Sequence, residues 1–294
     1  MHWDVKDMVA VTGKTKVVGI IGYPIEHSLS PIMQNSAFAA AAFLDYIYLP
    51  FAVPPEKLEA AVHGLRGLGV SGFNVTIPHK TAIISLLDRL DESAEAAGAV
   101  NTVKMTGSSL VGYNTDGDGL IDALSSELDY IPGSEQILVI GAGGAARGGI
   151  AALCRVGAGK ILICNRSLDN AYSIKSAMNS RYPGTEIDVA TPEQLSEKQL
   201  QASSLLLNTT PLGMKGEEIE HINISFLPAS AKVYDMVYSK SATPLVERAL
   251  ASFIPAVNGI GMLVAQGELA FKIWTGQNAP KGVMRGALDH ICRS

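Results

Sequence analysis

A glycine-rich run at residues 137–146 has the spacing needed to bind a phosphate group. Four apolar residues at its start predict a strand, and the residues after its glycines predict the first turn of a helix. Gly141 would allow a tight turn, and Gly143 would let a pyrophosphate reach the helix N-terminus, where N–H groups and the helix dipole attract anions. Ala146 takes the third position of this pattern. The run therefore predicts a dinucleotide site, and a turn that needs glycine for its geometry alone is the alternative.

The end of the next predicted strand, 161–164, bears on the ribose of such a nucleotide. NAD-binding folds usually place a carboxylate here, roughly 20 residues beyond the first glycine, to hold the ribose 2′-hydroxyl. This chain has Asn165, Arg166 and Ser167 instead. A guanidinium with neutral neighbours suits a 2′-phosphate, which an aspartate would repel. The segment therefore predicts NADP, and a solvated arginine at the strand end is the alternative.

Two serines near the N-terminus have the chemistry to hold a carboxylate. Ser28 and Ser30 flank a turn before a helix that Pro31 begins. Hydroxyl groups beside the N–H groups of a helix start can bind an anion together. Simple N-capping is the alternative, and it suits Ser30 better than Ser28.

Lys80 is a candidate ligand-binding residue. The sequence predicts a strand over residues 70–76 and then a helix over residues 79–90, with Pro78 at its favoured start. Lys80 would lie just inside that helix, so its ammonium group could reach over the carboxyl edge of the sheet, where open α/β sheets bind ligands. In most sequences such a lysine is only a solvated helix residue.

Four polar residues strengthen the case for Lys80, because each is expected to terminate a strand. They are Asn74, Thr76, Asn101 and Asp116. Strand ends at one sheet edge would place these side chains around one crevice, which predicts a binding site for a small polar substrate. Asp116 alone can equally be a helix cap, and Asp118 is interpreted as structural.

Alternating strands and helices must position these residues. Residues 100–113 predict two short strands around a turn at residues 106–109, so the first sheet is expected to be mixed. The other elements expected in the first part are strands at 17–21, 46–51 and 70–76 and helices at 31–44, 55–67 and 79–90.

The second part of the chain predicts βαβ units on a parallel sheet. Strands are expected at 137–140, 161–164, 187–189, 204–208 and 232–235, with a helix at 120–128 before them. Two last helices, at 261–275 and 281–292, are expected to pack back on the first domain. We therefore predict an α/β protein with a mixed substrate-binding domain, residues 1–118 completed by 258–294, and a doubly wound Rossmann-like domain at 119–257 that binds NADP.

The composition argues against several classes of protein. The net charge of −5, without long runs of either sign, does not suit a nucleic-acid partner. Cys154, Cys164 and Cys292 form neither a CxxC pair nor a zinc pattern, so no metal is expected. The longest apolar run, 37–44, is far shorter than a membrane span, and no signal peptide is evident. We expect a cytoplasmic protein without a membrane partner.

Seven motifs occur in a characteristic order. They read GYPIEHSLSP, GFNVTIPHK, GAVNT, GYNTD, NTTPLGM, DMVY and GMLVAQ, and they begin at Gly22, Gly72, Gly98, Gly112, Asn208, Asp235 and Gly261. Together they resemble the shikimate dehydrogenase family over residues 17–290. The resemblance implies an NADP-dependent oxidoreductase that interconverts 3-dehydroshikimate and shikimate in aromatic amino acid biosynthesis.

The resemblance also implies roles for individual residues. Lys80 and Asp116 would be catalytic, with Lys80 protonating the alkoxide that hydride transfer creates and Asp116 holding the lysine. The residues implied for the substrate are Ser28, Ser30, Asn74, Thr76, Asn101, Tyr238 and Gln266. Those implied for NADP are Gly141, Ala142, Gly143, Gly144, Ala145, Asn165, Arg166, Ser167, Thr209 and Gly261. The expected partner is a small molecule, and a homodimer is left open.

This chain departs from the family at three positions. Gln34 stands where histidine is common, Asn170 where a basic residue is common and Lys240 where proline is common. Because Asn170 removes one partner for a 2′-phosphate, an NAD-dependent quinate and shikimate dehydrogenase is the first alternative, and the missing acid at Asn165 argues against it. A catalytically silent nucleotide-binding sensor is the second alternative, and the presence of both catalytic candidates argues against it.

Overall fold

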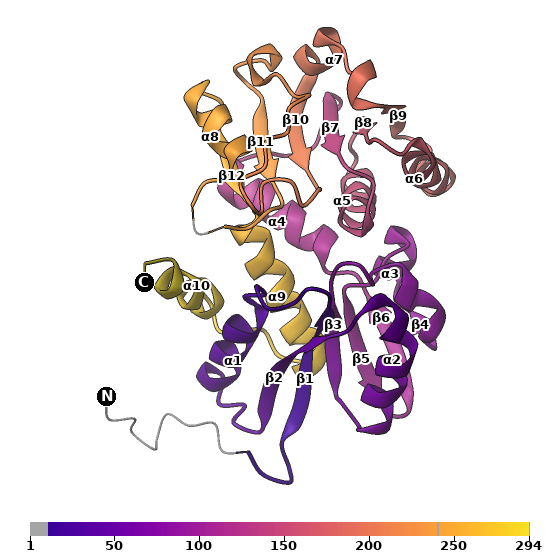
Figure 1. Ribbon diagram of the computed structural model, residues 1–294, viewed down its shortest axis with the longest axis vertical. Helices are drawn as coiled ribbons and strands as arrows, with labels where there is room; N and C mark the ends of the chain where they lie inside the picture. Colours follow the sequence, from indigo (N-terminus) through magenta and orange to yellow (C-terminus); the bar gives the residue numbers. More distant parts are fainter. Residues whose placement is uncertain (1–10, 240, 294) are drawn as a thin grey trace. The chain divides into compact units, whose positions relative to one another are not determined.

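The computed structural model describes residues 11–239 and 241–293, so Lys240 lies outside the described residues. The chain folds into two compact units (Figure 1). Unit 1 contains the residues up to Glu95, residues 99–115 and the residues from Gly267 onward. Unit 2 contains residues 96–98 and 116–266. Each unit has its own sheet, which fits the two-domain α/β organisation predicted from the sequence.

Unit 1 is built on a six-stranded mixed sheet. Its strands, in sheet order, are β2 (Tyr46–Ala52), β1 (Lys16–Gly22), β3 (Gly72–Val75), β5 (Thr102–Thr106), β6 (Ser109–Tyr113) and β4 (Arg89–Leu90). β1 is parallel to β2 and β3, whereas β5 is antiparallel to β3 and β6. The predicted hairpin and the mixed sheet are therefore confirmed. Because β5 is antiparallel, it begins at the sheet edge where β3 ends.

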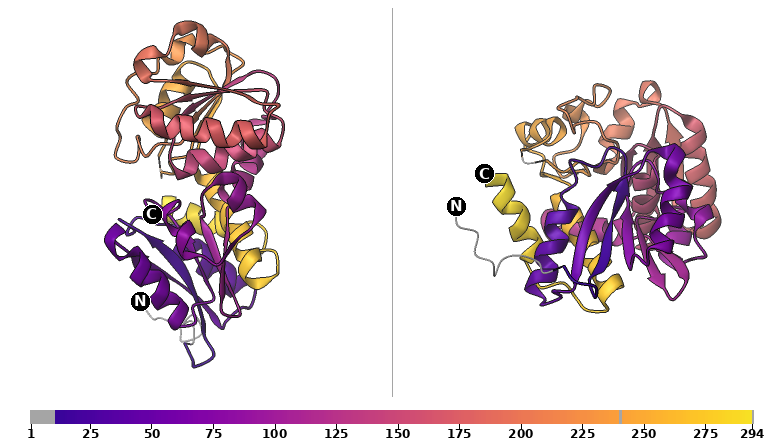
Figure 2. Two further views of the ribbon diagram at one scale, coloured as in Figure 1. Left: turned by 90° about the vertical axis from the view of Figure 1, so that its right-hand side faces the viewer. Right: turned by 60° about the horizontal axis from the view of Figure 1, so that its bottom comes forward.

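The C-terminal helices complete unit 1. The helices with residues in this unit are α1 (Ser30–Ala40), α2 (Leu58–Gly67), α3 (Glu92–Ala97), α9 (Ile260–Thr275) and α10 (Val283–Arg293). α10 packs beside α1 (Figure 2). Near the end of α9, Trp274 Nε1 donates to Val103 O at 3.0 Å, and a Cβ at Gly72 would lie 2.4 Å from the indole nitrogen. The predicted return of these helices to the first part of the chain is confirmed.

The helix predicted over residues 79–90 is wrong, and Pro78 begins no helix. The chain turns at Lys80, forms a short 3₁₀ segment at Ala82–Leu86 and then joins the sheet as β4. β4 pairs with β6, and Asp88 Oδ2 accepts a backbone hydrogen bond of 2.7 Å from the same strand. The sheet edge supplies these partners, and such tertiary contacts override a local helical pattern.

Smaller differences concern the lengths of elements. α1 ends at Ala40, four residues before its predicted end, and α4 begins at Asp116, four residues before its predicted start. The short helix α3 and a three-residue strand, β12 (Ala256–Asn258), were not predicted. Such short elements contain too few residues to show a hydrophobic period.

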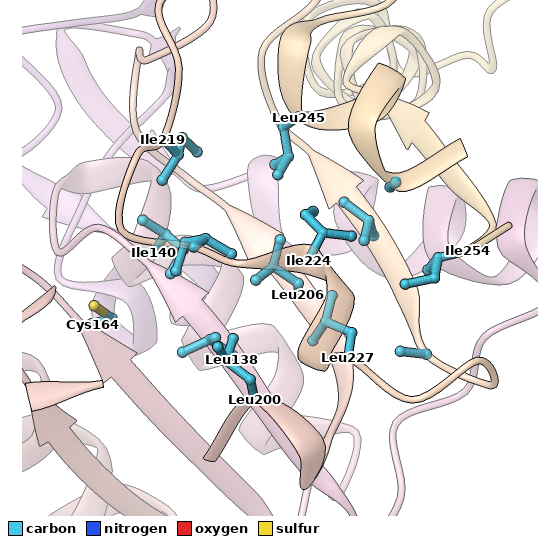
Figure 3. Close-up of a cluster of buried hydrophobic side chains, with 14 of the residues drawn as sticks. Leu138, Ile140, Cys164, Leu200, Leu206, Ile219, Ile224, Leu227, Leu245 and Ile254 are labelled. Carbon is cyan, nitrogen blue, oxygen red and sulfur yellow. The ribbon is translucent and has the colours of Figure 1, made fainter. Parts of the chain in front are cut away.

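Unit 2 is built on a parallel sheet. Its strands, in sheet order, are β12, β11 (Lys232–Asp235), β10 (Ser203–Asn208), β7 (Gln136–Ile140), β8 (Lys160–Cys164) and β9 (Glu186–Ala190). All five strands predicted here are confirmed. Leu138, Leu206 and Leu227 are among the buried side chains that pack on the sheet (Figure 3). The central strands β7, β8 and β10 contain continuous apolar runs, because both faces of a parallel sheet are covered.

Helices cover the unit-2 sheet. The longer ones are α4 (Asp116–Leu128), α5 (Gly144–Arg155), α6 (Leu168–Arg181) and α8 (Pro244–Ala251), and a short α7 spans Glu197–Gln201. α5 and α6 lie side by side on one face (Figure 2). α4 packs closely on α5, because a Cβ at Gly117 would lie 2.8 Å from Gly148 O. This close packing fixes the start of α4, and with it Asp116, against the nucleotide-binding helix candidate.

Candidate functional site

The carboxyl edge of the unit-1 sheet gathers most of the polar residues predicted for the substrate. Asn74 in β3 lies opposite Thr102 in β5. Val75 N–H donates to Asn101 O at 2.8 Å, and Asn101 N–H donates to Tyr113 O at 3.0 Å. Backbone hydrogen bonds therefore hold Asn74 and Asn101 on adjacent segments at one edge.

Two residues expected to terminate strands are placed differently. Asn101 directly precedes β5, and Asp116 is the first residue of α4. Asn101 still reaches the predicted edge, because an antiparallel strand begins where its neighbour ends. The clustering of Asn74 with Asn101 was therefore predicted correctly, but for a wrong reason.

Lys80 lies in the turn after β3 and is half-buried. Its carbonyl oxygen accepts a hydrogen bond from Val100 N–H at 2.7 Å, which holds it beside the residue that precedes Asn101. On the other side, His79 is buried and its Nε2 lies 2.7 Å from Val53 O. Because a carbonyl oxygen only accepts, Nε2 must carry the proton in this contact. The turn that presents Lys80 is thus held from both sides.

The side chain of Asn74 is buried and bonded within the protein. Its Oδ1 accepts a hydrogen bond of 2.7 Å from the Tyr48 hydroxyl. Its Nδ2 donates to Asn101 O at 3.1 Å and to Thr102 Oγ1 at 2.9 Å. Both amide hydrogens are therefore used inside unit 1, and Asn74 orients its neighbours.

Asn101 joins this network to the last residues of unit 1. Its Nδ2 donates to Thr115 Oγ1 at 2.9 Å, and its Oδ1 accepts from Thr115 N–H at 2.8 Å. Thr102 Oγ1 also donates to Asn101 Oδ1, at 3.1 Å. The network therefore sets the conformation of Thr115, the residue directly before Asp116.

Asp116 is buried at the start of α4. It is the first residue of its segment of unit 2, whereas Lys80 belongs to unit 1. The proposed pairing of Lys80 with Asp116 stays a prediction.

The serines lie in the connection between β1 and α1. The N-cap of α1 is Leu29, so Ser30, which is buried, is the first helical residue rather than the cap. Ser28 Oγ instead accepts a hydrogen bond of 3.3 Å from Ser30 N–H. A Cβ at Gly22, where this connection begins, would lie 2.3 Å from the Thr76 side chain. Close packing with Thr76 therefore brings the serine connection to the same sheet edge.

The backbone conformation and a close neighbour in unit 2 require glycine at position 141. Its φ is +108°, which side chains rarely adopt, and a Cβ there would lie 2.5 Å from Thr209 Oγ1. Thr209 is held in turn, because its hydroxyl donates to Ile140 O at 2.7 Å. The predicted tight turn after β7 is confirmed, and Thr209 lies against it.

Neither the backbone conformation nor a neighbouring atom requires glycine at position 143. Its φ is −89°, an ordinary value, and a Cβ there would have no heavy atom within 4 Å. It is the N-cap of α5, and no capping side chain bonds the N–H groups of the first helical turn. Uncapped N–H groups beside the open space at Gly143 suit a pyrophosphate, so the segment from Gly141 to Ala145 fits a dinucleotide.

The residues after β8 are those predicted to lie near the ribose of the nucleotide. Asn165 Nδ2 donates to Ser167 O at 2.8 Å, which closes the loop that exposes Arg166. Ser167 is the N-cap of α6, and its side chain forms no capping hydrogen bond. Asn170, one turn later, is exposed. The loop thus offers Arg166 and a helix start, both of which attract a phosphate.

Arg147 brings a second cation to this side of unit 2. It lies in the first turns of α5 and donates from Nη2 to Ser173 Oγ of α6 at 2.9 Å. Ser173 is three residues after Asn170 and therefore on the same side of α6. Arg147 was not predicted from the sequence, because an arginine inside a helix carries no signal of its own.

Three further predicted residues lie in unit 2. Burial raises the pKa of Tyr238 above its ordinary value, so its phenol stays protonated and can donate a hydrogen bond. Gln266 is buried, and its Nε2 donates to Leu263 O at 2.7 Å within α9. Gly261 lies against Glu127, whose Oε1 would lie 2.7 Å from a Cβ at that position. Glycine at 261 is therefore explained by helix packing within unit 2.

Asp235 is a buried carboxylate that begins the DMVY motif, and no role was predicted for it from the sequence. Its Oδ1 accepts from Asn208 Nδ2 at 2.8 Å and from Val237 N–H at 3.0 Å, and its Oδ2 accepts from Thr243 Oγ1 at 2.6 Å. Burial raises its pKa, and these hydrogen bonds oppose the rise. Asp235 ties the loop after β10 to the segment that carries Tyr238.

Two kinds of feature are absent from the described part of the chain. No three acidic, histidine or cysteine side chains of residues 11–239 and 241–289 gather in a way that could hold a metal ion. No helix in that part has the length and apolar character of a membrane span.

Family models match two segments of the chain. The model of the shikimate dehydrogenase substrate binding domain matches residues 20–103. The model of the shikimate 5′-dehydrogenase C-terminal domain matches residues 259–288. The first segment contains the end of β1, β2, β3 and the Lys80 turn, and the second contains all of α9 and the first part of α10.

Full-length relatives extend this similarity to nearly the whole chain. The shikimate dehydrogenase (NADP(+)) of Geobacter metallireducens is 53% identical over 94% of this chain and 96% of its own length. A crystal structure of a shikimate dehydrogenase in complex with NADP+ has a TM-score of 0.88 at 36% identity and covers 96% of this chain and 98% of its own. The Listeria monocytogenes shikimate 5-dehydrogenase, crystallised with shikimate and NAD, has a TM-score of 0.86 at 36% identity, with 96% and 99% covered. The chain belongs to the shikimate dehydrogenase family.

Proposed function

We propose that this chain catalyses the reversible, NADPH-dependent reduction of 3-dehydroshikimate to shikimate. The observation that carries the proposal is the clustering of Lys80 with Asn74, Asn101 and Thr102 at one edge of unit 1. A protein that only binds a nucleotide would not require a lysine at the edge of the other unit. The relatives named above bear the same activity in their names.

The nucleotide and the substrate are assigned to different units. Unit 2 would bind NADP through the Gly141–Ala145 turn, the Asn165–Ser167 loop, Thr209 and Gly261. Unit 1 would bind the substrate, with Tyr238 and Gln266 contributed by unit 2. The division predicted from the sequence, residues 1–118 with 258–294 and residues 119–257, stays a proposal. Gly261 and Gln266 belong to its substrate domain but lie in unit 2 of the structure.

Lys80 is the proton donor in the proposed mechanism. NADPH, when bound, supplies the hydride that reduces the ketone. The ammonium group of Lys80 protonates the substrate oxygen, because an alkoxide without a proton is costly in a cleft that excludes water. Asp116 holds the lysine in place and accepts a hydrogen bond from a neighbouring hydroxyl group of the substrate.

The remaining unit-1 residues bind the substrate. Ser28 and Ser30 hold its carboxylate at the start of α1, where helix N–H groups favour an anion. Thr76 and Asn101 donate or accept hydrogen bonds with ring hydroxyl groups. Asn74 contributes through Asn101 and Thr102, because both of its amide hydrogens are already bonded to these residues.

NADP is the proposed cofactor because no carboxylate stands after β8. Asn165 and the exposed Arg166 occupy that position, and Arg147 adds positive charge along α6. A 2′-phosphate would be attracted by both guanidinium groups. NAD-dependent action on quinate remains the competing activity.

One assay separates these activities. Nicotinamide absorbance is followed with shikimate and with quinate, each with NADP and with NAD. We expect the largest kcat/KM for shikimate with NADP. A larger value for quinate with NAD would replace the proposal by the competing activity, and no turnover with any of the four pairs would favour a nucleotide-binding sensor.

The cellular setting is part of the proposal. We expect the enzyme to act in the cytoplasm on a small-molecule substrate. The sequence left a homodimer open, and sedimentation velocity on the purified chain tests it: a single species near 31.0 kDa would exclude the dimer.

A further inference from the structure

Tyr48 is a polar side chain in the core of unit 1 whose position is determined from several directions. It is buried on β2, and its ring packs against Trp274 with centroids 5.9 Å apart. The side chain of Asn35 in α1 bonds both backbone groups of Tyr48, donating to its carbonyl oxygen at 3.0 Å and accepting from its N–H at 2.8 Å. The phenol therefore has little freedom to move.

Backbone groups determine the orientation of both amides in the network. Asn101 O can only accept, so the atom of Asn74 that faces it must be Nδ2. Thr115 N–H can only donate, so the atom of Asn101 that faces it must be Oδ1. Neither amide can be turned over without placing like groups together.

The hydrogen bonds then run in one direction. Tyr48 must donate to Asn74 Oδ1, and Asn74 Nδ2 donates to Thr102 Oγ1. Thr102 can then give its own hydrogen to Asn101 Oδ1, and Asn101 Nδ2 donates to Thr115 Oγ1. Tyr48 is the first donor of a series that ends beside Asp116.

We infer that Tyr48 is a positioning residue of the substrate site. Its hydroxyl group donates the hydrogen bond to Asn74 Oδ1, and Asn74 in turn orients Thr102, Asn101 and Thr115. Without the phenol, Asn74 Oδ1 loses its donor in a buried position, which costs free energy and makes the orientation of the amide less well defined. Asn101 then no longer presents a single arrangement of donor and acceptor to the substrate. The inference rests on the proposed function, because it assigns the substrate to this edge.

The decisive variant is Tyr48→Phe, which removes one oxygen atom and keeps the ring. Tyr46→Phe is the matched control, because Tyr46 lies on the same strand, is also buried and stacks on Phe38 at 5.0 Å, but belongs to no part of the network. For Tyr48→Phe we expect the KM for shikimate to rise about three- to tenfold, the size that follows from one lost neutral hydrogen bond. The KM for NADP should stay unchanged in both variants.

A second pair of variants tests the series further along. Thr102→Val removes the hydroxyl group and Thr102→Ser restores it. We expect Thr102→Val to raise the KM for shikimate and Thr102→Ser to return it toward the wild-type value. In the double variant Tyr48→Phe with Thr102→Val, the rise should be smaller than the product of the two single effects, because both act on Asn101. If Tyr48→Phe does not fold, the KM values of the two Thr102 variants still test the hydrogen-bond series, and an unchanged KM in Thr102→Val would contradict it.

The outcomes separate the possible failures. A Tyr48→Phe enzyme that is less stable but has the same KM for shikimate as Tyr46→Phe would make Tyr48 purely structural. Independent, multiplicative effects in the double variant would also overturn the inference. If the wild-type enzyme does not oxidise shikimate with either cofactor, the proposed function itself fails, a result that precedes and differs from these.

Discussion

The two sheet edges that carry the candidate sites are built in different ways. In unit 2 the edge presents mainly backbone groups. It contains Gly141 with its positive φ, Gly143 with open space beside it, and the starts of α5 and α6. In unit 1 the edge is made of side chains, with an antiparallel hairpin bringing Asn101 next to Asn74. A nucleotide phosphate can be held by main-chain N–H groups, whereas a particular ring of hydroxyl groups needs side chains in definite orientations.

This difference predicts where substitutions act. Changes at the unit-2 edge should alter cofactor binding with little effect on the substrate. Changes at the unit-1 edge should alter substrate kinetics and, at Lys80, the chemical step.

The largest effect is expected at Lys80. A positioned acid typically contributes ~10²–10⁴ in rate, so Lys80→Ala should lose turnover by a factor of that order while its affinity for NADP stays the same. Steady-state kinetics and fluorescence titration with NADPH provide the two measurements. Lys104→Ala is a suitable control, because Lys104 lies opposite Gly72 at the far end of β3.

The same experiment tests the pairing with Asp116. Asp116→Ala should also lose turnover, and the double variant should lose much less than the product of the two single effects, since the two groups are proposed to act together. Near-normal turnover of folded Lys80→Ala would contradict the mechanism. Fully multiplicative losses would contradict only the pairing.

The next largest effect is expected at Arg166. One charge-assisted hydrogen bond is worth ~1.5–3 kcal/mol, so Arg166→Ala should weaken NADP binding about ten- to a hundredfold and leave NAD binding unchanged. Dissociation constants for both cofactors provide the test. Equal weakening of NADP and NAD would remove Arg166 from the 2′-phosphate site.

Two glycines in one turn should respond differently to the same change. Gly141→Ala should destabilise the protein by ~1–3 kcal/mol, because its φ is positive and Thr209 leaves no space for a methyl group. Gly143→Ala should leave the unfolding midpoint nearly unchanged but weaken NADP and NAD alike. Equal effects of the two variants on urea unfolding would contradict the difference in local geometry, and unchanged affinity of Gly143→Ala for NADP and NAD would mean that the open space at Gly143 has no link to the cofactor.

The smallest effect concerns Asp235 and depends on pH. Because burial raises its pKa in the folded state, the folded protein holds this proton more tightly than the unfolded chain. Its contribution to stability is therefore largest below the ordinary aspartate pKa of about 3.9 and is lost as pH rises through the raised pKa. In Asp235→Asn this part of the pH dependence should disappear. Urea unfolding of both proteins at several pH values from 4 to 7 measures it, and parallel curves would contradict the prediction.

Local sequence predicted most of the unit-2 sheet. Its central strands β7, β8 and β10 contain continuous apolar runs, and the turn after β7 follows from glycines at a recognised spacing, so the five predicted strands and the tight turn at Gly141 are confirmed. Phosphate binding by a helix start needs only neighbours in sequence. The hydrogen bonds of Asp235 were not predicted, because its partners Asn208 and Thr243 come from other segments.

In unit 1 the sequence indicated candidate site residues, but it did not predict the local structure and the hydrogen-bond partners around them. Lys80 was expected inside a helix, yet it lies in a turn because the following residues pair with β6 as a strand. Tyr48 and Thr102 gave no functional signal, since a tyrosine and a threonine in alternating strands are ordinary sheet residues.

The sequence by itself determined the alternation of strands and helices, the glycine turn, the absence of an acid after β8 and the order of the seven motifs, which together indicated an NADP-dependent member of this family. These features depend on residues close together in the chain. Only the tertiary structure decided that Asn101 reaches the substrate edge by antiparallel pairing and that Tyr48 is bonded to Asn74. Hydrogen bonds between distant segments depend on strand order and register, and no local pattern of residue types contains that information.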